Sequence, residues 1–433
     1  MTNYVGADYY SPMEKEKWPD VGSTVHEQAE GRFTTSVAAK ARMGVVDLDL
    51  QLGASDQRGL TGTGSYGKEA RAELKKLAEL QGLNISSVHA PIMQGGINNL
   101  SGFDHKQNFN ENLRQQSIEE MRKVIDFAGD IATDKKPMAI TVHAGEFPRD
   151  IMETGAREFE EPGKAKVVSV TNFESGKIIS LPSDHPLNIV KMQEREGQEG
   201  VPIEERERVP VIQRNMTVEK FKRELDELNQ EFRGNKTEII RELNRRYGAG
   251  EDDEILNIFE ENETEQHIKP EVVFLRAHFA AEARSAFADF KRWQAEAERI
   301  DGQLQDERRE YGENPEPAQE RRLRELEAEA RWRRDTAVNS QRKWIDSKQS
   351  ITRFVPTKEE GLKRSGDSLG VSAIMAWEKQ QEKGLQKPIA IAPENFQTDQ
   401  FGSHPDEMIE FVEAGRKAFV QRLTEREIED PDG

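Results

Sequence analysis

The chain has no cysteine among its 433 residues, and this absence excludes several classes of protein. A disulfide scaffold, a zinc ribbon and a thiol nucleophile all require cysteine. Apolar residues are also scarce, because only 35% of the chain is hydrophobic and 7% aromatic, whereas 33% is charged. A chain this polar is a poor candidate for one compact globule. We therefore expect part of it to form thinly packed helices or to be disordered.

The sequence also lacks long apolar segments and an excess of positive charge. No run approaches the roughly 18 apolar residues of a membrane-spanning helix, and the N-terminus has no basic region followed by an apolar one. The net charge of -19 opposes binding to phosphate backbones and to anionic lipid. We therefore expect a cytoplasmic protein that does not bind membranes, and the charge disfavours nucleic acid as a partner.

The first 150 residues alternate between strand-like and helix-like patterns. Strands are predicted, from short apolar or alternating runs, over residues 4–7, 44–53, 84–92 and 137–147. Helices are predicted over residues 24–42, 67–82 and 110–132, and Leu80 is expected on the buried side of the second. Strands that alternate with helices in this way are typical of a parallel sheet in an α/β protein.

The alternation stops near Arg149 and resumes near Leu369. Beyond this point the sequence predicts a helix, a strand and a helix, over residues 371–384, 387–396 and 404–427. Ser403 and Asp406 form a capping-box pattern, and Pro405 occupies the first helical position. The start of the last helix is therefore well marked.

The segment between these halves has a different pattern. A β-hairpin is predicted over residues 166–182. Beyond Pro210 the sequence predicts helices over residues 217–233, 236–247, 270–310 and 316–350. The two longest helices each carry one apolar stripe and are separated by the NPEP motif, so we predict a long antiparallel helical arm. The aromatic residues of the first arm helix are expected to lie in the core of the arm; they are Phe279, Phe287, Phe290 and Trp293.

Three potential metal ligands stand where predicted strands end: His89, His143 and Glu394. The carboxyl ends of parallel strands meet at one rim of a sheet or barrel. Imidazole and carboxylate groups suit zinc or manganese, and an ionised carboxylate that ends a buried strand needs a cation or hydrogen-bond donors. The pattern therefore predicts a metal site at this rim.

Simpler interpretations stand beside this one. His89 fits a structural histidine at a strand end, and the turn after His143 fits a small polar junction. Glu146 is either an acid that supports a metal ligand or, more simply, a solvated loop carboxylate. Asp8 is either an additional metal ligand or a turn cap. The glycine-rich segment 61–67 lacks the lysine of a P-loop, so we predict a flexible loop there.

Four short motifs occur in order on the predicted strands: YVGADYYSP, HAPIMQGGINNLSG, VHAGEF and APENF. Together they resemble the xylose-isomerase-like TIM-barrel superfamily. That group contains sugar and sugar-phosphate isomerases and epimerases, and apurinic endonucleases of the endonuclease IV type. Gly6–Ala7 matches the opening of the first family strand, His89 the end of the third, His143 with Gly145 the end of the fourth, and Glu394–Asn395 the end of the fifth.

The resemblance implies an α/β fold with the first five β/α units of a TIM barrel, interrupted after the fourth strand by the mostly helical insertion. The implied domains are residues 1–150 (strands one to four), 151–368 (hairpin and helical arm), 369–427 (helix, strand five and helix) and 428–433 (acidic tail or linker). Strands six to eight would come from a downstream segment or a partner chain; the alternative is a degenerate barrel without them. The helical arm is a candidate surface for homo-oligomerisation.

The resemblance also implies a function. The expected activity is isomerisation or epimerisation of a sugar or sugar phosphate with a divalent metal, zinc or manganese. His89, His143 and Glu394 would bind the metal, with His143 or Glu394 moving the proton.

Two other functions remain open. One is a metal-dependent phosphodiesterase acting on abasic DNA, which the 17 basic and 21 acidic residues of segment 1–150 disfavour. The other is a non-catalytic scaffold that uses the arm for assembly.

Overall fold

The structure is a computed structural model that describes residues 22–27, 32–53, 63–91, 99–148, 167–194, 208–248, 258–259, 268–395 and 400–426. It divides into two compact units. Unit 1 comprises Met1–Arg149 and Gly361–Gly433, and unit 2 comprises Asp150–Glu360. None of the helices in the described ranges combines the length and apolar character needed to cross a membrane.

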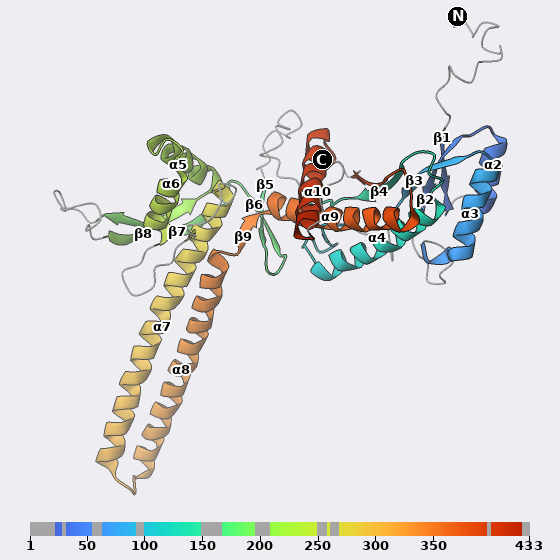
Figure 1. Ribbon diagram of the computed structural model, residues 1–433. Helices are drawn as coiled ribbons and strands as arrows, with labels where there is room; N and C mark the ends of the chain where they lie inside the picture. The colour runs from blue at the N-terminus through green and yellow to red at the C-terminus, as the bar shows by residue number, and fades with distance from the viewer. Residues whose placement is uncertain are drawn as a thin grey trace, which may run out of the picture. The chain divides into compact units, whose positions relative to one another are not determined.

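Unit 1 is an α/β structure built on a five-stranded parallel sheet, as Figure 1 shows for its first four strands. The strands are β1 (Gly22–His26), β2 (Asp47–Gln51), β3 (Asn84–His89), β4 (Met138–His143) and β10 (Ile389–Glu394). Their order is β1-β2-β3-β4-β10, and every neighbouring pair is parallel. The predicted α/β class is therefore confirmed. Over the described residues the sheet is open, with β1 and β10 at its edges.

The sheet of unit 1 has one apolar and one polar face. Leu48, Leu50, Val88, Ile140 and Val142 are buried. The residues that alternate with them are only partly buried and mostly polar; they include Asp49, Gln51, Ser87, His89 and Thr141. Because side chains alternate between faces along a strand, the polar residues share the face opposite the apolar core.

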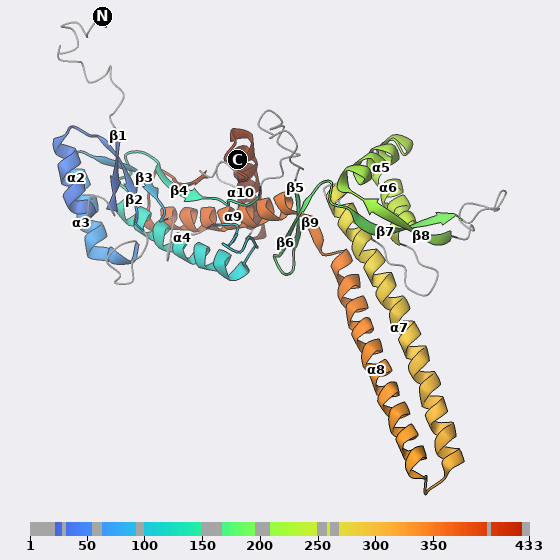
Figure 2. The same ribbon diagram turned by 180° about the vertical axis from the view of Figure 1, so that it is seen from behind.

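Among the described residues, unit 1 has a 3-10 turn (Thr63–Ser65) and the α-helices α2 (Phe33–Arg42), α3 (Lys68–Leu80), α4 (Glu111–Ile131), α9 (Thr357–Lys383, mostly in unit 1) and α10 (Pro405–Glu425). Helices α4 and α9 lie side by side in both views (Figures 1 and 2). Ion pairs join them, with Lys379 Nζ 2.8 Å from Asp126 and Lys383 Nζ 2.5 Å from Asp130.

Helices α9 and α10 pack closely through glycines. A Cβ atom at Gly366 would lie 2.8 Å from the Cβ of Ala414, and one at Gly370 would lie 2.7 Å from the Cβ of Ala418. Real Cβ atoms do not approach this closely, so only glycine fits at both positions without moving the helices apart.

Two predicted elements of unit 1 were wrong in their boundaries. The segment 24–42, predicted as a helix, begins inside β1, because Thr24 and Val25 pair with β2 before α2 starts at Phe33. Helix α9 begins at Thr357, well before the predicted start at residue 371. Its glycines weaken the helical pattern in the sequence although packing against α10 requires them. The predicted first strand, residues 4–7, lies outside the described residues.

The start of α10 also differs from the prediction by one residue. The N-cap is His404, whose ring nitrogen accepts a hydrogen bond from the Asp406 N–H at 3.3 Å. Glu407, not Asp406, completes the capping box by accepting from the His404 N–H at 3.4 Å. The hydroxyl of Ser403 instead donates to the carbonyl of Gln400 at 3.3 Å. Pro405 occupies the first helical position as predicted.

Two side chains near α3 lie differently from the prediction. Leu80 was expected on the buried side of the helix, but it is exposed at the last helical turn. Tyr66 was expected in a flexible glycine-rich loop, but it is buried, and its ring stacks on that of Phe33 with centroids 5.2 Å apart. An aromatic anchor therefore fixes residues 63–67, the described part of this segment, on the core of unit 1.

Unit 2 combines two small antiparallel sheets with helices. Its elements are β5 (Val167–Asn172), β6 (Ile178–Pro182), β7 (Leu187–Glu194), β8 (Arg208–Met216), α5 (Val218–Glu231), α6 (Lys236–Leu243), a π-helical turn (Asn244–Gly248), α7 (Pro270–Tyr311), α8 (Pro317–Ile351) and β9 (Phe354–Pro356). One sheet has the order β6-β5-β9, and the other is the hairpin β7-β8. The β5–β6 hairpin agrees with the prediction, whereas β7 and β8 were not predicted.

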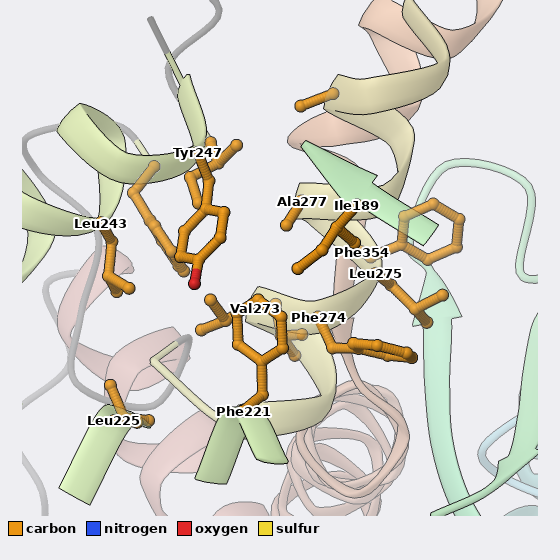
Figure 3. Close-up of a cluster of buried hydrophobic side chains, with 14 of the residues drawn as sticks. Ile189, Phe221, Leu225, Leu243, Tyr247, Val273, Phe274, Leu275, Ala277 and Phe354 are labelled. Carbon is orange, nitrogen blue, oxygen red and sulfur yellow. The ribbon is translucent and has the colours of Figure 1, made fainter. Parts of the chain in front are cut away.

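The core of unit 2 lies where α5, α6, β7 and β9 meet the first turns of α7 (Figure 3). Phe221 is at its centre, with ring centroids 5.1 Å from Tyr247 and 5.6 Å from Phe274. The α5 ring packs against the ring from the π-helical turn in a tilted geometry and against the α7 ring edge to face, both of which aromatic pairs favour.

The predicted arm is present as α7 and α8, two antiparallel helices of 42 and 35 residues (Figure 1). Aromatic side chains of the two helices contact each other, with ring centroids 4.9 Å apart for Phe287 and Trp344 and 5.7 Å apart for Trp293 and the half-exposed Trp332. A further apolar cluster joins the helices farther along; it contains Ile300, Leu304, Leu326 and Ala330. Phe287 and Trp293 therefore pair with residues of α8, as the sequence predicted, whereas Phe279 belongs to the core of unit 2 and stacks on Phe354 with ring centroids 5.0 Å apart.

Glu224 on α5 accepts hydrogen bonds from three side chains of unit 2. Lys191 Nζ lies 2.6 Å and Arg246 Nη1 2.8 Å from Oε1, and the Tyr247 hydroxyl lies 2.6 Å from Oε2. Burial alone would raise the pKa of this carboxyl. The three donors outweigh burial and hold the pKa below its ordinary value of 4.5.

A lowered carboxyl pKa makes the stability of unit 2 depend on pH. The ionised Glu224 stabilises the fold above pH 4.5, and this contribution is lost as the pH falls through the folded pKa. We expect Glu224→Gln to lower the free energy of unfolding at neutral pH by about 2 kcal/mol. We also expect it to flatten the decline of stability below pH 4.5. Urea unfolding at several pH values measures both effects. Glu227→Gln, on the exposed side of α5, is the control and is expected to change neither.

Candidate metal centre

The carboxyl ends of β3, β4 and β10 bring together the three residues predicted as metal ligands. In the sheet register Glu394 is the partner of His143, and His89 is the partner of Thr141, two residues before His143. β3 and β4 carry buried apolar residues up to their ends, whereas β10 is an edge strand in which only Ile389 is buried, so Glu394 does not end a buried strand as the sequence predicted. The candidate site is therefore a polar patch on the rim of the unit 1 sheet.

His89 and Glu394 are in direct contact at this rim. Nε2 of His89 lies 3.2 Å from Oε2 of Glu394, and Nδ1 of His89 lies 2.9 Å from the carbonyl oxygen of Ala90. A carbonyl only accepts hydrogen bonds, so Nδ1 carries a hydrogen. Nε2 then presents a lone pair to the carboxylate, and a proton or a metal cation is needed between the two atoms.

His143 lies beside this pair but is much less accessible. Its ring centroid is 5.9 Å from that of His89, and only 4% of the residue is exposed. Burial lowers its pKa, and the nearby His89 lowers it further, whereas the carboxylates of Glu146 and Glu394 oppose the shift. The net shift is downward, so the imidazole is neutral at pH 7.

Glu146 is buried, which corrects its assignment as a solvated loop carboxylate. Only 7% of the residue is exposed, and its Oε1 lies 3.9 Å from Nδ1 of His143. The side chain of Asn99 donates a hydrogen bond to the Glu146 carbonyl at 2.9 Å, and this contact holds the turn after His143 against the interior of unit 1. The buried Phe147 follows directly. The carboxylate therefore lies close to the imidazole of His143.

Asn395 braces the turn that follows His143. Its Nδ2 donates to the carbonyl of Gly145 at 3.1 Å, and its Oδ1 accepts from the Gly145 N–H at 3.4 Å. Asn99 has a similar bracing role on the other side, with Oδ1 accepting from the Ser101 N–H at 2.9 Å. Periodicity in the sequence cannot identify such residues. The only signals were the family-like pair Glu394–Asn395 and the polar NNLSG string.

The described residues contain no group of three or more His, Cys, Asp or Glu side chains close enough to hold a metal ion. The predicted triad is therefore present only in part: His89 and Glu394 are in contact, and His143 is adjacent. Two ligands about 2.1 Å from a tetrahedral zinc ion lie about 3.4 Å apart, so the 3.2 Å between Nε2 and Oε2 suits such a pair. Asp8 and Gly6–Ala7 lie outside the described residues.

Comparison of the chain with models of protein families, with curated proteins and with solved structures finds no match.

Proposed function

We propose that this rim binds a divalent cation, zinc or manganese, and that the chain takes part in metal-dependent isomerisation or epimerisation of a sugar or sugar phosphate. The proposal includes the interpretation of the five-stranded sheet as the first five strands of a TIM barrel. The parallel strand order and the position of the polar side chains at the strand ends support it.

The orientation of His89 is the observation that carries the proposal. Metal-binding histidines commonly donate one ring N–H to a backbone carbonyl, which turns the other nitrogen toward the ion. The Ala90 carbonyl has this role here, and Glu394 supplies a carboxylate oxygen on the other side. The side chain of Glu394 is 50% exposed, so a cation and a substrate can reach it from solvent.

The side chains suit distinct tasks in such a reaction. A bound divalent cation would polarise an oxygen atom of the substrate. His89 and Glu394 would hold the cation, and the neutral His143 beside them would accept a proton. Glu146, 3.9 Å from His143, would stabilise the imidazolium that forms.

Removal of either cation ligand tests the site directly. We expect His89→Gln and Glu394→Gln each to weaken binding of Mn²⁺ or Zn²⁺ by at least about tenfold, because each variant removes one of two contacting ligands. Isothermal titration calorimetry on the chelator-treated full chain measures the affinities. His105→Gln, an exposed histidine in a turn, is the matched control and is expected to bind as the wild type does.

Equal metal affinity in the wild type and all three variants would contradict the proposal. His89 and Glu394 would then be a protonated ion pair. A chain without bound zinc, manganese or iron that still captures a second protein stoichiometrically would favour the scaffold function, for which the arm provides the surface.

The reaction class needs a separate measurement. In deuterium oxide with Mn²⁺, sugar phosphates are expected to exchange the hydrogen next to the carbonyl, and His143→Gln is expected to abolish this exchange. Nuclear magnetic resonance of the sugars detects the exchange. Metal-dependent cleavage of abasic duplex DNA, with tight binding at low salt, would instead identify the phosphodiesterase.

A further inference from the structure

Helix α10 presents a mixed apolar and charged face to solvent. Ile409, Val412 and Val420 are 55%, 49% and 39% exposed. The opposite side of the helix carries the buried Phe411 and Gly415, and this side packs on α9. Exposed β-branched residues grouped on one side of a packed helix indicate a surface for another helix.

The exposed residues follow a coiled-coil spacing. Ile409, Glu413, Arg416 and Val420 are separated by four, three and four residues. This spacing places them in one stripe about 16 Å long, with an apolar residue at each end and two opposite charges in the middle. Neither Glu413 nor Arg416 forms an ion pair with another described residue of the chain.

We propose that this stripe is the docking surface for α10 of a second copy of the chain, in an antiparallel pair about a two-fold axis between Ala414 and Gly415. Ile409 then faces Val420 of the partner subunit, and Glu413 faces Arg416 of the partner subunit. The two-fold axis repeats both contacts, so the stripe is complementary to itself.

The charges select this arrangement over a parallel one. In a parallel pair in register, Glu413 would face Glu413 of the partner subunit, and the two arginines would face each other. Like charges at such positions oppose association, whereas the antiparallel pair forms two ion pairs beside two apolar contacts. A contact between two helices of this length is smaller than the roughly 1,200 Å² of stable interfaces. We therefore expect a dissociation constant in the micromolar range.

Charge exchange tests the pairing. Glu413→Arg and Arg416→Glu are each expected to weaken the dimer by at least about tenfold, because each places like charges opposite each other twice. The double variant Glu413→Arg/Arg416→Glu restores both ion pairs and is expected to dimerise nearly as well as the wild type. Sedimentation velocity of the full chain over a range of concentrations measures the dissociation constants. Glu73→Arg, an exposed position on α3, controls for the change in net charge.

Disulfide formation tests the antiparallel register. The natural chain has no cysteine, so introduced thiols have no competing partners. Oxidation of the double variant Ile409→Cys/Val420→Cys is expected to give a covalent dimer. The two positions are about 16 Å apart within one helix, beyond the roughly 7 Å limit for an intramolecular bond. Ile409→Cys alone is expected to stay monomeric on a denaturing gel.

Three results would overturn the proposal. A wild-type chain that is monomeric up to about 100 µM does not use this surface for self-association. A dimer that neither single charge variant weakens uses another surface, such as the arm. Efficient cross-linking of Ile409→Cys alone would show a parallel pair.

Discussion

Replacement of Arg276 by methionine is expected to lower the free energy of unfolding of unit 2 by about 3 kcal/mol. Arg276 is fully buried near the start of α7. Its Nη1 donates to the carbonyl of Ile258 at 2.8 Å, and its Nη2 donates to the carbonyl of Phe354 at 3.0 Å. The guanidinium carbon lies 4.7 Å from the centroid of the Phe259 ring. Methionine keeps an apolar stem but leaves two buried carbonyls without these donors.

We expect the stability of unit 2 to depend on the planar shape of the Arg276 guanidinium as well as on its charge. Arg276→Lys retains the charge but has no rigid fork to reach carbonyls on two different segments, so it is also expected to destabilise unit 2. Urea unfolding followed by the fluorescence of the arm tryptophans Trp293, Trp332 and Trp344 measures these changes. Arg309→Met, at the exposed far end of α7, is the control and is expected to change stability by about 0.5 kcal/mol or less. A similar small change for Arg276→Met would contradict the bridging role.

The arm was predictable because local signals determine it. A proline at the first turn of each helix, a continuous apolar stripe and the NPEP turn placed α7 and α8 within about one residue of their observed ends. The β7–β8 hairpin was not predictable in this way. Its strands form a two-stranded ribbon with many polar residues, and charged positions obscure the alternation that identifies a half-buried strand.

The sequence predicted the strand ends that carry the candidate site, but not the contacts among its residues. Apolar runs marked where β3, β4 and β10 stop, but His89 and Glu394 are 305 residues apart in sequence. Only the topology of the parallel sheet, which places β10 beside β4 across the whole insertion, brings them together. The supporting contacts of Asn395 and Glu146 depend on backbone atoms of the folded turn. No pattern of residue types in the sequence encodes such contacts.

Close packing in the C-terminal part of unit 1 depends on glycines. Helix and strand patterns in the sequence do not reveal this packing role. Gly366 and Gly370 allow α9 to approach α10, and Gly402 performs a similar function next to the candidate site. The φ angle of Gly402 is +100°, and a Cβ there would lie 2.2 Å from Nδ2 of Asn395 and 2.5 Å from Cε2 of Phe411. Both the backbone conformation and the space around it therefore require glycine.

Gly402→Ala is expected to lower the free energy of unfolding of unit 1 by about 4 kcal/mol, the largest loss among these variants. The added methyl must displace the Asn395 amide or the buried Phe411 ring. Displacement of Asn395 releases the Gly145 carbonyl, so we also expect weaker binding of Mn²⁺ or Zn²⁺ by the folded protein. Differential scanning calorimetry measures the stability, and titration with metal below the unfolding transition measures the binding.

Gly44→Ala separates the two causes of this loss. Gly44 also has a positive φ, of +79°, but a Cβ there would have no heavy atom within 4 Å. Alanine at this position therefore adds backbone strain alone, at a cost of about 1 kcal/mol. The difference between the two variants measures how tightly the protein packs around Asn395. If Gly402→Ala were no more destabilising than Gly44→Ala, the turn after His143 would not depend on this contact, and Asn395 would not brace the candidate site.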